Sequence, residues 1–208
     1  MAQITTGIRK IFSNPIVYDL FQNAVGAKKR RKKLISEYFS LKPGMKILEI
    51  GSGPGVFAKH FEDHIFYTGV DLSQAYIEYA QKKYAEKKNM RFICEDVNHF
   101  QLKEDEKFDL VFMVGVLHHL EDKECLKVFE TAYHCLKNEG KCLSVEPVYT
   151  NHQSKLSKFI ISKDRGLNVR TNEAYKKLAV QSFQNYRSEI HHDLLYIPYT
   201  QIIIECIK

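Results

Sequence analysis

Residues 45–55 read MKILEIGSGPG, in which a short apolar run leads into three glycines at every second position. The run has the aliphatic composition of a buried strand, and Gly51, Gly53 and Gly55 end it. Glycine adopts positive φ and lets a ligand or another backbone come close, at a cost in conformational entropy. Three glycines at this spacing therefore predict a strand-to-helix turn that is shaped around a ligand.

Strand-like and helical patterns alternate along the chain from this turn onward. The apolar runs that predict strands are residues 46–50, 66–70, 91–94, 108–114 and 141–145. Helical patterns lie between them at 56–62, after the N-cap Ser73 and over 125–136, with a turn at 138–140. This alternation predicts a doubly wound α/β sheet with right-handed crossovers.

The last part of the chain departs from the alternation. A helical pattern at 175–183 is followed by two strand-like runs, 186–191 and 196–207, with no helix between them. Two consecutive strands without a crossover pair antiparallel. The sequence therefore predicts a seven-stranded, mostly parallel sheet that ends in a C-terminal antiparallel hairpin.

A chain of 208 residues has the length of a single domain. We expect residues 1–44 to form an N-terminal helical cap of that domain. Helices are predicted in this cap near residues 5–12, 16–25 and 28–39. Residues 45–208 then form the ligand-binding domain, in which residues 147–170 are a lid-like insertion.

Composition argues against several classes of protein. No apolar run approaches the ~18 residues of a membrane span, and the N-terminus has no signal-peptide core. The five cysteines form no CxxC pair, so we expect buried, reduced thiols in a cytoplasmic protein. The net charge is +6, with basic residues gathered at 28–33 (KKRRKK) and 148–170. These regions are either solvated faces or a positive rim that attracts an anionic partner.

The spacing of the glycine loop separates it from two phosphate-binding loops. The dinucleotide fingerprint GxGxxG needs a third glycine where this chain has Val56, and the P-loop needs a Lys-Ser/Thr pair that is absent here. An acid, Glu49, stands two residues before the first glycine, which gives the pattern ExGxGxG.

Landmarks in a fixed order over residues 45–207 resemble the class I S-adenosylmethionine-dependent methyltransferases. LEIGSGPG resembles the first motif of that family, Asp71 in GVDLS ends the second strand, and Asp96 in CEDV follows the third. VLHHLED at 116–122 follows the fourth strand, and LKNEGKCLSVEP at 136–147 resembles the family's LKPGG element. The resemblance implies a Rossmann-like transferase that uses S-adenosyl-L-methionine and releases S-adenosyl-L-homocysteine.

The resemblance also implies which residues bind this cofactor. Asp71 would accept hydrogen bonds from both ribose hydroxyls, as a carboxylate at a strand end can. Asp96 would face the adenine amino group, and Glu49 would orient the loop or reach the amino-acid end. The other residues expected at the cofactor are Gly51, Ser52, Gly53, Leu72, Val97 and Val114. In the N-terminal cap, the residues expected to close over it are Tyr18, Gln22 and Lys28.

Two histidines are the candidate catalytic residues. Methyl transfer from a sulfonium is an in-line displacement, in which positioning supplies much of the acceleration. His118 and His119 follow the fourth strand and could take a proton from the nucleophile, or could instead pack or cap the next helix. No metal site is predicted, since His191 and His192 are neighbours on one strand and point to opposite faces.

The acceptor is only broadly defined by the sequence. There is no (D/N)PP(Y/F/W) after the fourth strand and no Pro-Cys pair, so the chain is most similar to the small-molecule branch of the family. Residues 14–33 and 147–170 are expected to bind the acceptor. Leu156, Phe159 and Ile160 predict an amphipathic lid helix that closes over an anionic, sugar-linked or lipid-linked acceptor, or lies on a membrane surface.

Two other functions remain open from the sequence. The KKRRKK run at 28–33 would suit an RNA-directed methyltransferase, whose binding would weaken steeply with salt. A non-catalytic, cofactor-binding partner that regulates another subunit would keep the same fold. Measured methyl transfer separates the second alternative from an enzyme.

Overall fold

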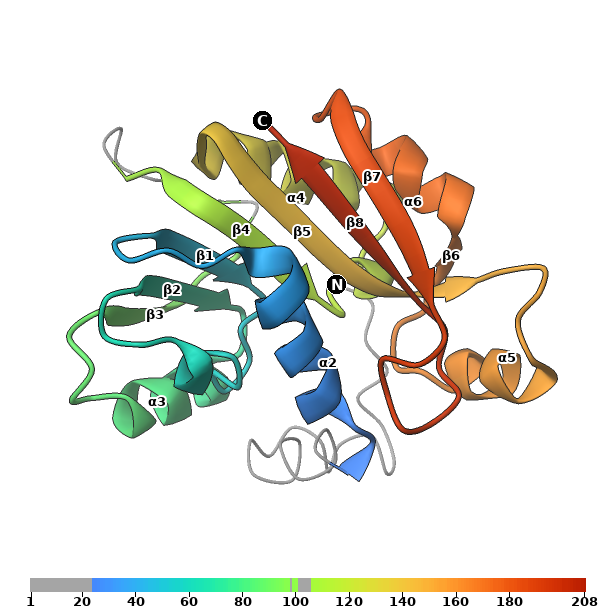
Figure 1. Cartoon of the computed structure of the whole chain (residues 1–208), viewed down its shortest axis with the longest axis horizontal. Coiled ribbons are helices and arrows are strands. Elements are labelled where there is room, and N and C mark those ends of the chain that lie inside the picture. Colours follow the sequence, from blue (N-terminus) through green and yellow to red (C-terminus); the bar gives the residue numbers. More distant parts are fainter. Residues whose placement is uncertain (1–23, 98, 101–105) are drawn as a thin grey trace.

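A mixed sheet crosses the molecule in the strand order β3-β2-β1-β4-β5-β8-β7 (Figure 1). The computed structural model describes residues 24–97, 99–100 and 106–208. The strands are β1 (Lys46–Ile50), β2 (Phe66–Asp71), β3 (Met90–Cys94), β4 (Phe108–Val114), β5 (Leu136–Tyr149), β7 (Asn185–His191) and β8 (Gln201–Ile207). A two-residue strand, β6 (Arg170–Thr171), pairs with the end of β5.

The first five strands pair in parallel, and β8 pairs antiparallel with both β5 and β7. The predicted fold class, a doubly wound and mostly parallel sheet with a C-terminal antiparallel hairpin, is confirmed. The strand β1 lies between β2 and β4, so the chain order reverses there. In open α/β sheets, the carboxyl ends of the strands at such a reversal form the ligand-binding crevice.

Helices cover both faces of the sheet. They are α2 (Ala27–Lys33), which continues into the π-helix η2 (Leu34–Phe39), α3 (Gln74–Lys83), α4 (Asp122–Cys135), α5 (Lys155–Ser162) and α6 (Asn172–Ala179). Two single turns of 3₁₀-helix are η3 (Ala58–His60) and η4 (Leu117–His119). Figure 1 shows α2 in front of the sheet and α4 and α6 behind it.

Side chains of β4 explain how both faces are filled. Val111 and Met113 belong to a core cluster with residues of α4 and α6, whereas Leu110 and Phe112 belong to a second cluster with η2 and α3. The alternation follows from the two-residue period of a strand, and the continuous apolar run from burial on both faces. The Phe112 ring lies 4.7 Å from that of Phe39 in η2.

Local signals set the helix starts. The Ser73 hydroxyl caps α3 by accepting a hydrogen bond from the Tyr76 N–H at 3.4 Å, as predicted. Glu121 and Glu124 form a capping box at the start of α4, because each side chain accepts from the other's backbone N–H. Such caps satisfy N–H groups that have no partner within the helix.

Two expected elements differ from the structure. The helix predicted at 56–62 is only the single turn η3, because Gly51, Gly53 and Gly55 hold positive φ and the chain is extended again at Phe61. The last strand begins at Gln201 rather than residue 196, because Leu195 and Tyr199 pack into a cluster beneath α5.

The other corrections are smaller. The predicted turn at 138–140 lies within β5, where Glu139 has φ +60°. Four cysteines are buried as expected, but Cys94 at the end of β3 is exposed. Within the described residues, no helix combines the length and the apolar composition needed to cross a bilayer.

Candidate active site

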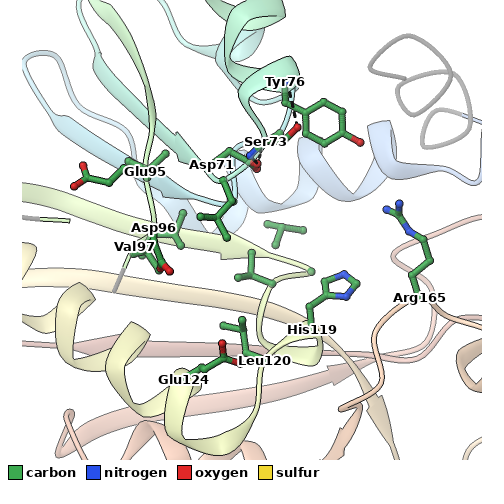
Figure 2. A pocket seen from close by; sticks show the side chains of 18 residues that line it. Asp71, Ser73, Tyr76, Glu95, Asp96, Val97, His119, Leu120, Glu124 and Arg165 are labelled. Atoms are coloured by element: carbon green, nitrogen blue, oxygen red, sulfur yellow. Dashed lines mark hydrogen bonds between the residues drawn. The ribbon is translucent and has the colours of Figure 1, made fainter. Parts of the chain in front are cut away.

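A cavity of about 320 Å³ opens at the carboxyl ends of β1, β2 and β4 (Figure 2). We call it the donor cavity. Its lining includes the predicted residues Gly51, Gly53, Asp71, Leu72, Asp96, Val97, Val114 and His119. In the view of Figure 2, Asp96 and Val97 lie at one end of the cavity, and His119 and Arg165 lie at the other.

Gly51 and Gly53 both line the donor cavity, but a side chain would have different surroundings at the two positions. Gly51 has φ +72°, and a Cβ there would lie 2.5 Å from Cγ2 of Val116. Gly53 has φ +53°, and a Cβ there would meet no atom within 4 Å. The loop is therefore packed tightly against the segment after β4 at Gly51 and leaves open space beside Gly53.

Asp71 is fixed at the cavity wall by two backbone hydrogen bonds. Its Oδ2 accepts from the Gly53 N–H and its Oδ1 from the Ser73 N–H, both at 2.8 Å. Burial raises the pKa of Asp71, and these backbone hydrogen bonds oppose that rise. Each oxygen keeps a second acceptor position, so the oriented carboxylate can still receive two hydroxyl groups.

Several predicted cofactor residues do not line this cavity. Glu49 is buried and accepts a hydrogen bond from the Tyr67 hydroxyl, and burial raises its pKa well above the ordinary value although that bond lowers it. Ser52 is buried against Gly69, and Lys28 is exposed on α2. Tyr18 and Gln22 lie outside the described residues.

The sequence analysis missed part of the lining. The missed residues include Ser73, Tyr76, Glu95, Leu120, Glu124 and Arg165. Most of them stand within a few positions of a predicted motif, so proximity to Asp71, Asp96 or His119 could have indicated them. Arg165 is different, because it comes from the segment after α5 and no local spacing connects it with the glycine loop.

A second cavity of about 350 Å³, the acceptor cavity, adjoins the first. The two share Val114, Gly115, His119 and Arg165. Three cationic side chains line the acceptor cavity: Arg30, Lys163 and Arg165. Apolar lining comes from Phe159 and Ile160 of α5 and from Leu195 and Ile197.

His118 is buried between two carboxylates. Its Nδ1 lies 2.7 Å from Oε2 of Glu146, and its Nε2 lies 3.1 Å from Oδ1 of Asp164. Burial alone would lower the pKa of His118, but the two carboxylates outweigh burial and raise it to about 9. Asp164 is affected in the opposite sense: burial raises its pKa, and the partner His118 lowers it to a net value below the usual range.

His119 has the opposite environment although it is the next residue. Burial, and then the charge of His118, lower its pKa to about 3, so its imidazole is neutral near pH 7. The two ring centroids are 4.0 Å apart. His119 lines both cavities, and within the described part of the chain its buried Nδ1 has no hydrogen-bond partner.

His118, His119 and Asp164 also bring potential metal-ligand atoms within 4.8 Å of one another. Both nitrogens of His118 already contact carboxylates, so binding a metal there would require breaking a bond of this pair. We therefore interpret the cluster as a hydrogen-bond network. His191 and His192 contact different partners, Tyr38 and Thr200, respectively.

Sequence comparison places a known domain over the first half of the sheet. Residues 47–140 match the family profile described as a methyltransferase domain. Phosphoethanolamine N-methyltransferase 2 of Caenorhabditis elegans is 34% identical over 115 residues, which cover 53% of this chain and 26% of that protein. Malonyl-[acyl-carrier protein] O-methyltransferase 1 of Ilyobacter polytropus is 31% identical over 98 residues, which cover 46% of this chain and 35% of that protein.

The chain thus aligns with about a quarter to a third of the length of these curated relatives. Among solved structures, phosphoethanolamine N-methyltransferase 2 of Haemonchus contortus, in complex with phosphomonomethylethanolamine and S-adenosylhomocysteine, matches with a TM-score of 0.69. The sequence identity is 19%, and the match covers 86% of this chain and 52% of that one. At this identity the likeness concerns the fold.

Proposed function

We propose that the chain carries a class I, S-adenosylmethionine-dependent methyltransferase domain, as its sequence predicts, and that it transfers a methyl group to a small anionic acceptor. One observation carries the proposal. The donor and acceptor cavities meet at Val114, Gly115, His119 and Arg165. A molecule in one cavity and a molecule in the other would therefore come into contact at this junction, as an in-line displacement requires.

The lining of the donor cavity supports binding of S-adenosylmethionine, and its glycine loop lacks the spacing of a dinucleotide-binding loop. A carboxylate can accept hydrogen bonds from both ribose hydroxyls, and we propose this role for Asp71, which two backbone hydrogen bonds orient at the cavity wall. The cofactor supplies a methyl group on a positively charged sulfur. The open space beside Gly53 leaves room for the backbone to approach it closely.

The acceptor cavity favours an anion that also has an apolar part. Arg30, Lys163 and Arg165 line it, and the oxygens of its acid Asp164 accept hydrogen bonds from His118, Gly166 and Tyr199. The name of the nematode relative indicates a phosphorylated amine as its acceptor, which agrees with a cationic cavity. We propose a phosphorylated or carboxylated metabolite, with sugar-linked and lipid-linked forms included.

His119 is the residue that we propose to contact the nucleophile. It lines both cavities, and its neutral imidazole can accept a hydrogen bond from an amine or hydroxyl. An anionic acceptor would favour the protonated ring and so raise the proton affinity of His119 as it binds. His118 has no free nitrogen for this role.

The exposed face of α5 supports contact with a lipid-linked acceptor. Leu156 and Phe159 are 58% and 60% exposed, and Lys155 and Lys158 are exposed beside them. Phe159 also lines the acceptor cavity. An apolar side chain between lysines is the arrangement that binds at an anionic lipid surface. Flotation with phosphatidylserine vesicles, compared with phosphatidylcholine vesicles, tests this contact.

Isotope transfer tests the proposed function. We expect calorimetry to show micromolar binding of S-adenosylmethionine or S-adenosylhomocysteine. Labelled methyl should then pass to phosphoethanolamine or to another anionic metabolite in a fractionated cell extract. If neither cofactor binds, the methyltransferase proposal fails. If the cofactor binds and no fraction takes label, the non-catalytic alternative is favoured.

The RNA-directed alternative has less support from the structure. Within the run KKRRKK, Arg31 is buried and Arg30 lines the acceptor cavity, so the run does not form one outward basic stripe. Label that enters the RNA fraction, together with steeply salt-dependent RNA binding, would nevertheless favour it.

A further inference from the structure

We propose that His118 is a positioning residue: an imidazolium between Glu146 and Asp164 that ties the segment after α5 to the floor between the two cavities. This assigns His118 a role different from that of a catalytic base. We call the set of Glu146, His118 and Asp164 the bridge. The proposal rests on the proposed function only in identifying the two cavities as donor and acceptor sites, because the bridge consists of contacts within the protein.

The hydrogen-bond pattern favours donation from both ring nitrogens of His118. Oε1 of Glu146 accepts from the N–H groups of Val116 and Leu117 at 3.0 and 2.9 Å, and Oε2 faces Nδ1 of His118. Asp164 accepts from the Gly166 N–H at 2.9 Å and from the Tyr199 hydroxyl at 2.6 Å. Both carboxylates are thus acceptors toward the ring, and a ring that donates from both nitrogens is an imidazolium.

The bridge joins parts of the chain that are far apart in sequence. Glu146 is near the end of β5, His118 follows β4, Asp164 follows α5, and Tyr199 precedes β8. His118 is 5% exposed, so the ion pairs are shielded from solvent and depend strongly on their partners.

Backbone contacts place the segment after α5 directly on His118. The Asn168 N–H donates to the His118 carbonyl at 2.9 Å. At Gly166, an added Cβ would lie 2.0 Å from Cδ2 of the His118 ring and 2.6 Å from its carbonyl oxygen. Only a glycine allows this segment to lie so close to the ring.

The bridge has a consequence for the two residues next to it. Arg165 follows Asp164 and His119 follows His118, and these two neighbours line both cavities. Fixing Asp164 on His118 therefore fixes Arg165 and His119 at the junction. The adjacent imidazolium also helps to lower the pKa of His119, after burial.

Histidine NMR tests the charge of the bridge. In protein with ¹⁵N-labelled histidine, we expect His118 to give the signal of a ring protonated at both nitrogens up to about pH 8. The signal that disappears in His118→Asn is assigned to His118. His134→Asn, which removes an exposed histidine, is the matched control. A single protonated nitrogen on His118 at pH 7 would overturn the proposal.

Hydrogen exchange tests the positioning itself. In His118→Asn we expect amides of residues 164–168 to exchange about tenfold faster, with S-adenosylmethionine binding retained within about twofold. Gly166→Ala should loosen the same segment without altering any charge, which keeps the test usable if His118→Asn fails to fold. Unchanged exchange in a folded variant of either kind would contradict the proposal. If the wild-type protein binds no S-adenosylmethionine, that result would instead count against the proposed function.

Discussion

The donor cavity is lined largely by loops that directly follow parallel strands, whereas the acceptor cavity takes its wall from α2, from α5 and its following segment, and from the loop before β8. Parallel strands bring their carboxyl ends to one edge of a sheet whatever the loops contain. The donor cavity thus follows from the topology itself. The acceptor cavity depends on long-range packing, such as the bridge between His118 and Asp164. Damage to residues that line only one cavity should therefore leave the other cavity largely intact.

The largest expected effect is on the donor side, at Gly51. We expect Gly51→Val to lower S-adenosylmethionine affinity by more than about 100-fold, because the new side chain meets Val116 and φ is +72° there. Calorimetry measures this change. Gly44→Val is the matched control, since Gly44 has φ +83° but no atom within 4 Å of an added Cβ. The control should lose about 1–2 kcal/mol of stability and keep its affinity. Equal loss of affinity in both variants would mean that strain alone causes it.

A smaller donor-side effect is expected at Asp71. We expect Asp71→Asn to weaken S-adenosylmethionine binding about 10–100-fold, the range for charge-assisted hydrogen bonds lost to two hydroxyl groups. Asp109→Asn is a fitting control: Asp109 also accepts a backbone N–H, from Lys46 at 2.7 Å, but it lies at the opposite end of the strands. Binding that is unaffected in Asp71→Asn would remove the ribose-binding role.

The residues of the two cavities also show how far the structure can be predicted from the sequence. Asp71 was predictable because a carboxylate at the end of one strand and a glycine loop at the end of the next must meet in a parallel sheet. Arg165 and Tyr199 were not, because nothing in their local sequence indicates that Asp164 joins them to His118. Glu49 shows a third case: it stands two residues before the glycine loop, but its carboxyl group faces Tyr67 rather than the cavity.

On the acceptor side we expect a more moderate effect from the cationic lining. Arg30→Gln should raise the KM for an anionic acceptor about tenfold, with S-adenosylmethionine affinity unchanged, because Arg30 lines only the acceptor cavity. Steady-state kinetics with phosphoethanolamine, or with the metabolite that takes label, provide the measurement. Lys32→Gln on the same helix is the control, since Lys32 is exposed and lines neither cavity. A KM that rises equally in both variants would indicate only long-range electrostatic attraction between the basic helix α2 and the anionic acceptor.

The smallest expected effect, and the one that separates the cavities most directly, is on pH dependence. His118 has a pKa of about 9 in the folded protein against an ordinary value of 6.5, so its contribution to stability is complete below about pH 6.5 and is lost as the pH rises through 9. The acceptor KM should therefore rise a few-fold between pH 7 and about pH 9.5 while S-adenosylmethionine affinity changes little. In His118→Asn the acceptor KM should already be raised at pH 7 and should lose this pH dependence. If the wild type and His118→Asn instead showed the same profile, the titrating group would have to be another one, and the acceptor cavity would not depend on the bridge between Glu146, His118 and Asp164.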